Sequence, residues 1–405
     1  MKIIKNRVYN QLDAQQPEEQ AGFRKKYRTI DHIHTLNQLV EKAKEYKINV
    51  YVMFVDYRNA FDSIKHKRIW EGLTKQGVPR KILRILKEMY GKAKAYVKMD
   101  KKGPKFEIAN GIKQGDPMSS NIFNCVLEEI FRVMDWSNKG INIGGTYLNN
   151  LRFADDIVLI STTKEELQEM ANELEKISRE EGLNINIDKT KYMSNVEGDE
   201  GGVVIETGEI EKTEEYVCLG QTISMKEGIK RELKVRKSKA WGKFWSLQKI
   251  FRSKLSTEAK IRILESSVIP VLCYGAETWA LTKSEVEGIQ KTQRAMERII
   301  LGIKRGTKIR NEEIRKRTNS KEVGYLIKKQ KFKYAGHMIR GSKERWARKV
   351  TDWLPYGNRR GRGRPNTRWE DEIKNRVGVA WEREVWNRET WRKIGEAYAQ
   401  QWVVC

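Results

Sequence analysis

The stretch from Leu151 to Thr162 constrains this chain most, and it reads Leu-Arg-Phe-Ala-Asp-Asp-Ile-Val-Leu-Ile-Ser-Thr. Apolar residues on both sides of Asp155 and Asp156 predict two buried strands, so both acids are expected in the tight turn of a β-hairpin. Adjacent carboxylates repel each other and raise one pKa, unless a cation keeps both ionised. A hard divalent cation with oxygen ligands would do so. An ordinary turn rich in Asp is the alternative interpretation.

Two further stretches place polar residues at the ends of predicted elements. Residues 49–61 form an apolar run, rich in β-branched and aromatic residues, that loses its strand character after Asp56. Residues 110–120 form a polar loop in which Pro117 is expected to open an amphipathic helix. The sequence therefore predicts a carboxylate at one strand end and a second polar segment at the start of a helix.

In order and spacing, these stretches resemble the palm motifs of reverse transcriptases, and most closely those of non-LTR (LINE-type) retrotransposons. The motifs are Phe-Val-Asp-Tyr-(x)2-Ala-Phe-Asp from Phe54, Gly-(x)2-Gln-Gly-Asp-Pro-(x)-Ser from Gly111, Phe-Ala-Asp-Asp from Phe153, and Gly-Leu followed by Lys-Thr at Lys189. The Gln-Ala-Gly-Phe-Arg segment that begins at Gln20 resembles the part that precedes the first palm strand in that family. The resemblance covers roughly residues 4–223.

The resemblance implies an α+β fold of the right-hand polymerase type. Residues 1–223 would form a partial fingers region and a palm, in which helices back an antiparallel sheet. Basic amphipathic patterns after Ser224 predict helices, and the resemblance implies that these helices form a thumb over residues 224–310. Residues 311–405 would form a basic, Arg- and Trp-rich C-terminal region that binds nucleic acid.

The implied activity is RNA-directed DNA polymerisation, a nucleotidyl transfer that extends a DNA primer on an RNA template with dNTPs. Asp56, Asp155 and Asp156 would hold two Mg2+ ions, with Mn2+ as a possible substitute. Lys189 matches the family position that lies near the leaving pyrophosphate, where an ammonium can act as general acid. An ordinary surface lysine is the alternative. No obligate protein partner can be read from the sequence.

Five residues are candidates for contacts with the incoming nucleotide. In the family, an aromatic residue at the position of Phe61 stacks under the sugar and excludes a 2′-hydroxyl, although Phe61 alone could be a core residue. Gln114 and Gly115 would approach the base pair, and a helix cap is the alternative for their loop. Arg24 and Arg28 would contact phosphates, or they belong to a solvated basic loop.

The charge of the chain points to a polyanionic partner. Its 405 residues include 80 Lys and Arg against 54 Asp and Glu, for a net charge of +26. The most biased segment carries five arginines spaced by Gly and Pro, and it predicts a flexible arm for phosphates or a minor groove. These arginines are Arg359, Arg360, Arg362, Arg364 and Arg368. A solubilising loop or a nuclear import signal is the alternative.

Other sequence features concern compartment and completeness. The four cysteines contain no Cys-(x)2-Cys pair, so an intracellular protein is expected. No apolar run is long enough for a membrane span, so no association with a membrane is expected. The expected location within the cell is the nucleus. The Arg-Pro-Ile fingers motif and the endonuclease domain of the family do not precede the palm motifs, so an N-terminally truncated copy of a transposable element is expected. A catalytically inactive nucleic-acid-binding remnant is the alternative function.

Local patterns predict several further elements. Thr163 and Glu166 have the spacing of a helix capping box. The other predicted elements are a helix over 31–46, a strand over 183–193, helices over 233–251 and 261–272, and a closing helix over 369–402. Residues 216–220 resemble the short hairpin that holds the primer strand in the reverse transcriptase family.

Overall fold

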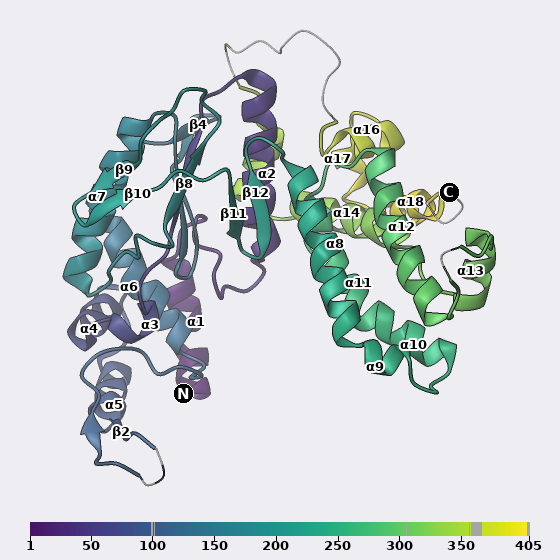
Figure 1. Ribbon diagram of the computed structural model, residues 1–405. Coiled ribbons are helices and arrows are strands. Elements are labelled where there is room, and N and C mark those ends of the chain that lie inside the picture. The colour runs from purple at the N-terminus through teal and green to yellow at the C-terminus, as the bar shows by residue number, and fades with distance from the viewer. Residues whose placement is uncertain (99, 101, 305, 356, 358–366, 403–405) are drawn as a thin grey trace. The chain divides into compact units, whose positions relative to one another are not determined.

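The computed structural model describes residues 1–98, 100, 102–304, 306–355, 357 and 367–402, and its chain divides into two compact units (Figure 1). The first unit comprises residues 1–32, 48–216 and 353–356, and the second comprises residues 33–47, 217–352 and 357–405. The domain boundaries expected at 223/224 and 310/311 stay predictions. Among the described residues, no helix combines the length and apolar character needed to cross a membrane.

A four-stranded antiparallel sheet with the order β6-β7-β1-β8 lies at the centre of the first unit. Val55 pairs with Ile157 across the two middle strands, and Phe153 pairs with Asp156 across the hairpin. The strands are β1 (Tyr51–Val55), β6 (Asn150–Phe153), β7 (Asp156–Ser161) and β8 (Lys191–Ser194). The predicted hairpin and the antiparallel sheet are therefore confirmed.

Helices cover one face of this sheet, as the α+β prediction requires (Figure 1). Alternate residues of β1, namely Tyr51, Met53 and Val55, belong to the apolar core of the first unit, because successive side chains of a strand point to opposite faces. The core also takes the apolar stripes of α6 (Ser119–Val133) and α7 (Lys164–Glu181). Helices α1 (Lys2–Ala14) and α4 (His66–Lys75) contact α6.

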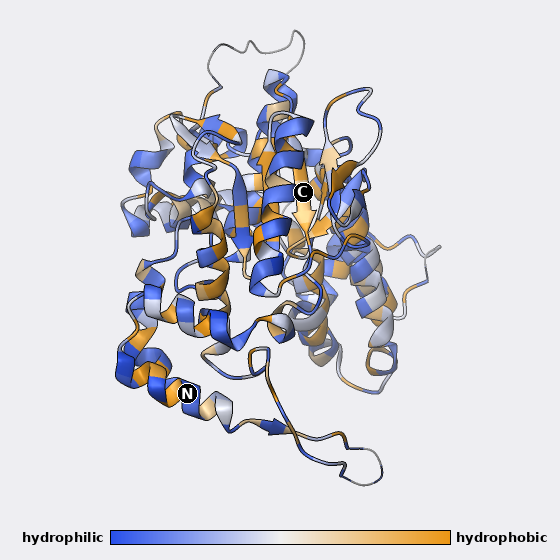
Figure 2. Cartoon of the chain, turned by 90° about the vertical axis from the view of Figure 1, so that its left-hand side faces the viewer, coloured by the Kyte–Doolittle hydropathy of each residue, from blue (hydrophilic) through white to orange (hydrophobic). Residues whose placement is uncertain are grey.

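The remaining elements of the first unit are short, apart from α5 (Arg80–Gly91). Hairpin β2–β3 extends away from the helices of this unit, and hydrophilic and hydrophobic residues mix along it (Figure 2). The short elements are α3 (Ala60–Ser63), β2 (Lys94–Ala95), β3 (Phe106–Glu107), β4 (Ile141–Ile143), β5 (Thr146–Leu148), β9 (Val203–Ile205) and β10 (Gly208–Ile210). The predicted helix α2 (Thr29–Tyr46) is present, and the division between the units falls within it.

The second unit is mainly helical, so the prediction of helices after Ser224 is confirmed. The role of these helices as a thumb stays a prediction. Its apolar core includes Phe244, Leu264, Trp279 and Met296. Its elements are β12 (Gln221–Ser224), α8 (Ile229–Ser246), α9 (Gln248–Phe251), α10 (Thr257–Ile263), the π-helix η1 (Leu264–Val268), α11 (Ile269–Leu272), the 3-10 helix η2 (Ala276–Thr278), α12 (Lys283–Ile300), α13 (Asn311–Thr318), α14 (Val323–Ile339), α15 (Trp346–Asp352), α16 (Asp371–Val377), α17 (Trp381–Glu384) and α18 (Arg388–Gln400).

The predicted hairpin around residues 216–220 forms between β11 (Glu215–Cys218) and β12. Its two turn residues, Leu219 and Gly220, both have positive φ, at 48° and 83°. Positive φ at both central residues is the requirement of a type I′ turn, whose twist matches that of the flanking strands. A role of this hairpin in holding the primer stays a prediction.

Three local predictions were wrong in part. The strand expected over residues 183–193 begins only at Lys191, because residues 186–190 form a turn. The closing helix over 369–402 is three helices, with breaks after Val377 and Glu384. The Thr163 hydroxyl caps α7, but the Glu166 carboxylate accepts from the N–H groups of Thr162 and Gly140, so only half of the capping box forms.

Candidate active site

Asp56 follows β1 directly, and the loop of residues 184–190 holds its backbone. The Asp56 N–H donates to the Thr190 hydroxyl at 3.1 Å, and the Asp56 carbonyl accepts from the Asn186 N–H at 2.7 Å. Two residues further on, the Arg58 N–H donates to the Asn184 carbonyl at 2.9 Å. Because both backbone groups of Asp56 are bonded to one loop, the direction in which its carboxylate leaves the strand end is fixed.

The β6–β7 hairpin brings the other two acids to the same end of the sheet. Its loop consists of Ala154 and Asp155, while Asp156 is the first residue of β7, so the expectation that both acids occupy the turn was wrong for Asp156. Because Val55 pairs with Ile157, the residues that come next at that end are Asp56 and Asp156. Ala154 has a φ of +58°, which L residues rarely adopt.

The three carboxylates interact electrostatically. Burial, followed by the charges of Asp155 and Asp56, raises the pKa of Asp156 to about 6. Burial also raises the pKa of Asp155, and the charge of Asp56 adds to this effect. The Oδ2 atom of Asp56 is buried and accepts no hydrogen bond, and its ion-pair partner Lys189 lies 3.7 Å away. The site therefore holds negative charge that a cation would stabilise.

The donor chemistry suits a hard divalent cation. In the part of the chain that the structure describes, no three His, Cys, Asp or Glu side chains are grouped so that they alone could hold a metal ion. Mg2+ usually takes only one or two carboxylates from a protein and completes its octahedron with water and substrate phosphates. The Oδ2 of Asp56, which accepts no hydrogen bond, and the carboxylate of Asp155 are such ligands, so the residues fit Mg2+ that is shared with a phosphate-bearing substrate.

Lys189 lies in the turn before β8 and not on a strand as expected. Its side chain is 69% exposed, and its Nζ pairs with Asp56. An exposed ammonium beside the acids can reach a bound anion, so its role as general acid stays a prediction.

The structure gives Phe61 and Gln114 defined surroundings. Phe61 is half-buried and stacks on Phe123 of α6, with ring centroids 4.4 Å apart. The Gln114 amide donates to both carboxylate oxygens of Asp62 at 3.3 Å. Gln114 also lines a cavity of about 560 Å³ together with His66. The proposed contacts of both residues with a nucleotide stay predictions.

Gly115 has a φ of +82°, and a Cβ added there would meet nothing within 4 Å. Its backbone conformation accounts for a glycine at this position. The open space beside it is compatible with close approach of a ligand, which stays a prediction.

Arg24 does not fit the phosphate-binding role expected for it. Its Nε donates to Asp13 at 3.0 Å, its other N–H groups donate to the backbone carbonyls of Asp13, Pro17 and Gln20, and its side chain is 8% exposed. The guanidinium therefore holds the loop that follows α1. Arg28, by contrast, is exposed, and its role stays a prediction.

The arginine-rich arm lies mostly outside the described residues, which include none of Arg359, Arg360, Arg362 and Arg364. Arg368 is described, and its Nε donates to the Glu45 carboxylate of α2 at 2.9 Å. Its guanidinium is therefore engaged within the second unit. Binding of nucleic acid by this segment stays a prediction.

Three buried polar residues in and next to the β6–β7 hairpin were not predicted. Arg152 of β6 pairs with Glu128 of α6 at 3.0 Å, and both side chains are less than a tenth exposed. Gln20 is completely buried and bonds to the hairpin turn. Gln20 belongs to the segment whose resemblance to the family was noted, and its position in that motif was the available signal.

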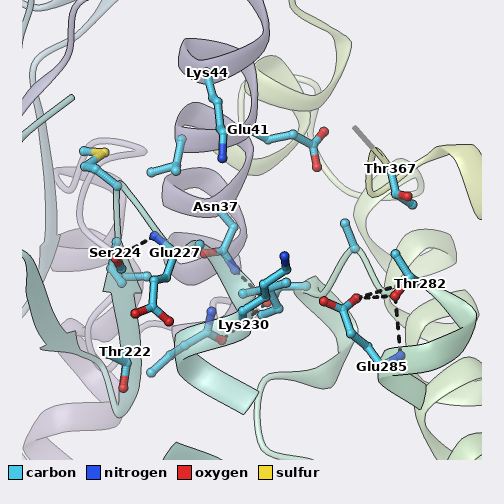
Figure 3. A pocket seen from close by; sticks show the side chains of 18 residues that line it. Asn37, Glu41, Lys44, Thr222, Ser224, Glu227, Lys230, Thr282, Glu285 and Thr367 are labelled. Atoms are coloured by element: carbon cyan, nitrogen blue, oxygen red, sulfur yellow. Dashed lines mark hydrogen bonds between the residues drawn. The ribbon is translucent and has the colours of Figure 1, made fainter. Parts of the chain in front are cut away.

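A second cavity, of about 510 Å³, lies in the second unit (Figure 3). Glu41 and Lys44 of α2 line it, together with Glu227, Lys230 and Glu285. Burial raises the pKa of Glu41 to about 7. Because acids and lysines both line this cavity, its charge favours neither an anion nor a cation.

Comparison with known proteins identifies the family. Residues 1–223, more than half of the chain, match the family model described as reverse transcriptase (RNA-dependent DNA polymerase). The chain belongs to the reverse transcriptase family. Family membership confirms the resemblance read from the palm motifs and places Asp56, Asp155 and Asp156 inside the matched region.

Relatives within the reverse transcriptase family come from mobile elements. A transposon-derived protein of Caenorhabditis elegans is 31% identical over 245 residues, which cover 58% of this chain and 88% of that protein. The Pol polyprotein of the retrotransposable element R2 of Nasonia vitripennis is 32% identical over 36% of this chain and 14% of its own length. The RNA-directed DNA polymerase of the X-element of Drosophila melanogaster is 24% identical over 74% of this chain and 34% of its own length.

These relatives confirm the likeness to R2- and LINE-type non-LTR retrotransposons, although this chain spans only a small part of the R2 polyprotein and about a third of the X-element polymerase. Among solved structures, the telomerase of Candida tropicalis without its C-terminal domain is 15% identical, with a TM-score of 0.42 over 55% of this chain and 44% of that chain.

Proposed function

We propose that this chain is an RNA-directed DNA polymerase that extends the 3′ end of a DNA primer on an RNA template with dNTPs. The observation that carries the proposal is the meeting of Asp56, at the end of β1, with the Asp155–Asp156 hairpin at one end of the sheet. The raised pKa values of Asp155 and Asp156 support it, because carboxylates that are buried and lie close to one another are typical of functional sites such as those that bind cations.

In this proposal, Asp56 and Asp155 hold divalent metal ions, Mg2+ or Mn2+, and Asp156 completes the negative charge of the site. When bound, the metals lower the pKa of the primer 3′-hydroxyl and stabilise negative charge on the triphosphate and the leaving pyrophosphate. The chain itself orients the acids, through the loop that bonds to Asp56 and through the hairpin turn. Lys189 would donate a proton to the pyrophosphate as it leaves.

The surroundings of the acids would select and orient the nucleotide. The ring of Phe61, held by stacking on Phe123, would lie under the sugar and exclude a 2′-hydroxyl. Gln114 and Gly115 would approach the base pair from their loop. The net charge of +26 would attract the template-primer duplex, so its binding should weaken as salt rises.

Primer extension on two templates tests this function. A DNA primer is annealed to an RNA template and to a DNA template of the same sequence, and both are incubated with four dNTPs and Mg2+. The proposal expects extension on RNA and loss of that extension in the Asp155→Asn variant. Tight binding of both duplexes without extension under Mg2+ or Mn2+ would instead support a nucleic-acid-binding remnant.

A further inference from the structure

The side chain of Gln20 is bonded to the turn that carries Asp155. Gln20 is 0% exposed, and its Oε1 accepts from the Gly22 N–H at 2.7 Å and from the Ala154 N–H at 3.1 Å. The backbone around Gln20 runs beside β6, because the Ala21 N–H donates to the Arg152 carbonyl and the Arg152 N–H donates to the Glu19 carbonyl. One side-chain oxygen thus joins this segment to the hairpin turn.

The bond to Ala154 matters because of the conformation of that residue. Ala154 has a φ of +58° and is 2% exposed, so its N–H is buried in a backbone conformation that an L residue rarely adopts. Without Gln20, this N–H would lack a partner in a place where water cannot replace it. Because the N–H groups of Gly22 and Ala154 both donate to Oε1 of Gln20, the orientation of the Gln20 amide is fixed. In the flipped orientation, the NH2 group of Gln20 would point at these two donors and no hydrogen bond could form.

Gly22, two residues after Gln20, also joins this segment to its surroundings. A Cβ added at Gly22 would lie 2.3 Å from the Ala154 nitrogen, so the two backbone segments approach each other closely there. The Asn124 amide of α6 donates to the Gly22 carbonyl at 2.7 Å. Helix α6 begins just after the Gln114–Gly115 loop, so the segment of Gln20 links two motifs of the candidate site.

We propose that Gln20 is a positioning residue for nucleotidyl transfer. By holding the Ala154 N–H, it fixes the turn that presents the Asp155 carboxylate. The expected effect on the rate of nucleotide addition rests on the proposed polymerase function. The effect on the hairpin turn does not, because hydrogen exchange at the turn can be measured without activity. Misplacement of Asp155 lowers the rate of nucleotide addition more than it weakens binding of the template-primer or the dNTP.

Three variants of the full chain separate positioning from general stability. Gln20→Met keeps the length of the side chain and removes the acceptor, whereas Gln20→Glu keeps an acceptor oxygen. Gln76→Met is the matched control: Gln76 is 2% exposed, lies in the same unit, and its amide donates to the Cys125 carbonyl and to Glu129, away from the hairpin. Each variant is measured by amide hydrogen exchange of the peptide spanning 151–157 and by kcat and KM for dTTP.

The expected result is faster exchange of the 151–157 peptide in Gln20→Met, with recovery in Gln20→Glu and no change in Gln76→Met. For nucleotide addition, Gln20→Met should lose at least about tenfold in kcat while KM changes by less than about threefold, since small misplacement of a catalytic group is costly. Unchanged exchange in Gln20→Met, or equal losses of kcat in Gln20→Met and Gln76→Met, would overturn the inference. A wild type that extends no primer would refute the proposed function, while the exchange result would still decide whether Gln20 holds the turn.

Discussion

The amide N–H of Asp56 donates to the hydroxyl of Thr190, which lies 134 residues later in the chain, at 3.1 Å. Thr190 is completely buried, and the next residue begins β8. The position of the first acid of the site therefore depends on the last motif of the palm. Thr190 therefore helps to position Asp56, a role separate from the one predicted for the adjacent Lys189.

Replacing Thr190 should test this dependence. Thr190→Val preserves the shape of the side chain and leaves the Asp56 N–H without a partner, so we expect a loss of about 1–3 kcal/mol in the free energy of unfolding. Thr190→Ser keeps the hydroxyl and should retain most of the stability and the extension rate. Urea denaturation and single-nucleotide addition measure the two effects. Equal behaviour of Val and Ser variants would show that the hydrogen bond is unimportant.

The raised pKa of Asp156 predicts how stability depends on pH in metal-free protein. The folded state holds a proton up to about pH 6, whereas an unfolded Asp releases it near pH 3.9, so stability falls as pH rises across this window. Asp156→Asn removes this loss and should be more stable than wild type at pH 7 and similar to it at pH 4, as measured by thermal unfolding in EDTA.

Asp135 provides a control of opposite sign. Hydrogen bonds from Ser137 lower the pKa of its carboxyl, so Asp135 contributes stability that is lost as pH falls. Asp135→Asn should therefore be less stable than wild type at pH 7. If Asp156→Asn also proved less stable at pH 7, burial and the neighbouring charges would not raise the pKa of Asp156 in the folded protein.

The buried pair of Arg152 and Glu128 should be strongly coupled. Glu128→Met alone leaves the guanidinium of Arg152 buried without its carboxylate and should cost about 3–5 kcal/mol. The double variant with Arg152→Met should lose much less than the sum of the single losses. The exposed pair Lys92–Glu88 serves as the comparison, and its coupling is expected to be much weaker because solvent screens it. Equal coupling energies for the two pairs in urea denaturation would contradict this account.

Phe61 should control the choice between deoxyribonucleotides and ribonucleotides. Phe61→Val removes the ring that would lie under the sugar, and we expect the preference for dTTP over UTP to fall by about 10- to 100-fold, or about 1.4–2.8 kcal/mol. Phe131→Leu is a control, because Phe131 also packs against the core but contacts Trp136. Unchanged discrimination in Phe61→Val would leave Phe61 as a core residue.

Much of the first unit could be predicted because its motifs combine a strand pattern with a functional residue. The runs around Asp56 and Asp155 are short, apolar and rich in β-branched residues, which favours buried strands, and the structure pairs them as expected. The prediction of a single closing helix was wrong, because the hydrophobic periodicity continues across Gly378 although the helix ends there. Gly378 has a φ of 104°, which is incompatible with an α-helix. Local conformation overrides periodicity at such a position.

The supporting residues could not be predicted from sequence in the same way. The roles of Gln20 and Thr190 depend on hydrogen bonds to residues more than a hundred positions away, and neither residue carries a charge. Arg24 is the opposite case: its charge suggests a phosphate ligand, but its donors are bonded to Asp13 of α1 and to backbone carbonyls of the following loop. Composition identifies charge but does not reveal its partners.

Asp56 and Asp155 are proposed to hold the metal ions that polymerisation requires. The most direct test is incorporation of labelled dTTP on an oligo(dT)-primed poly(A) template with Mg2+, for wild type, Asp56→Asn, Asp155→Asn and the exposed control Asp135→Asn. We predict extension by wild type and the control, and at least about a thousandfold lower rates in the two site variants, a loss of about 4 kcal/mol of transition-state stabilisation. Near-wild-type extension by Asp56→Asn or Asp155→Asn would contradict the account.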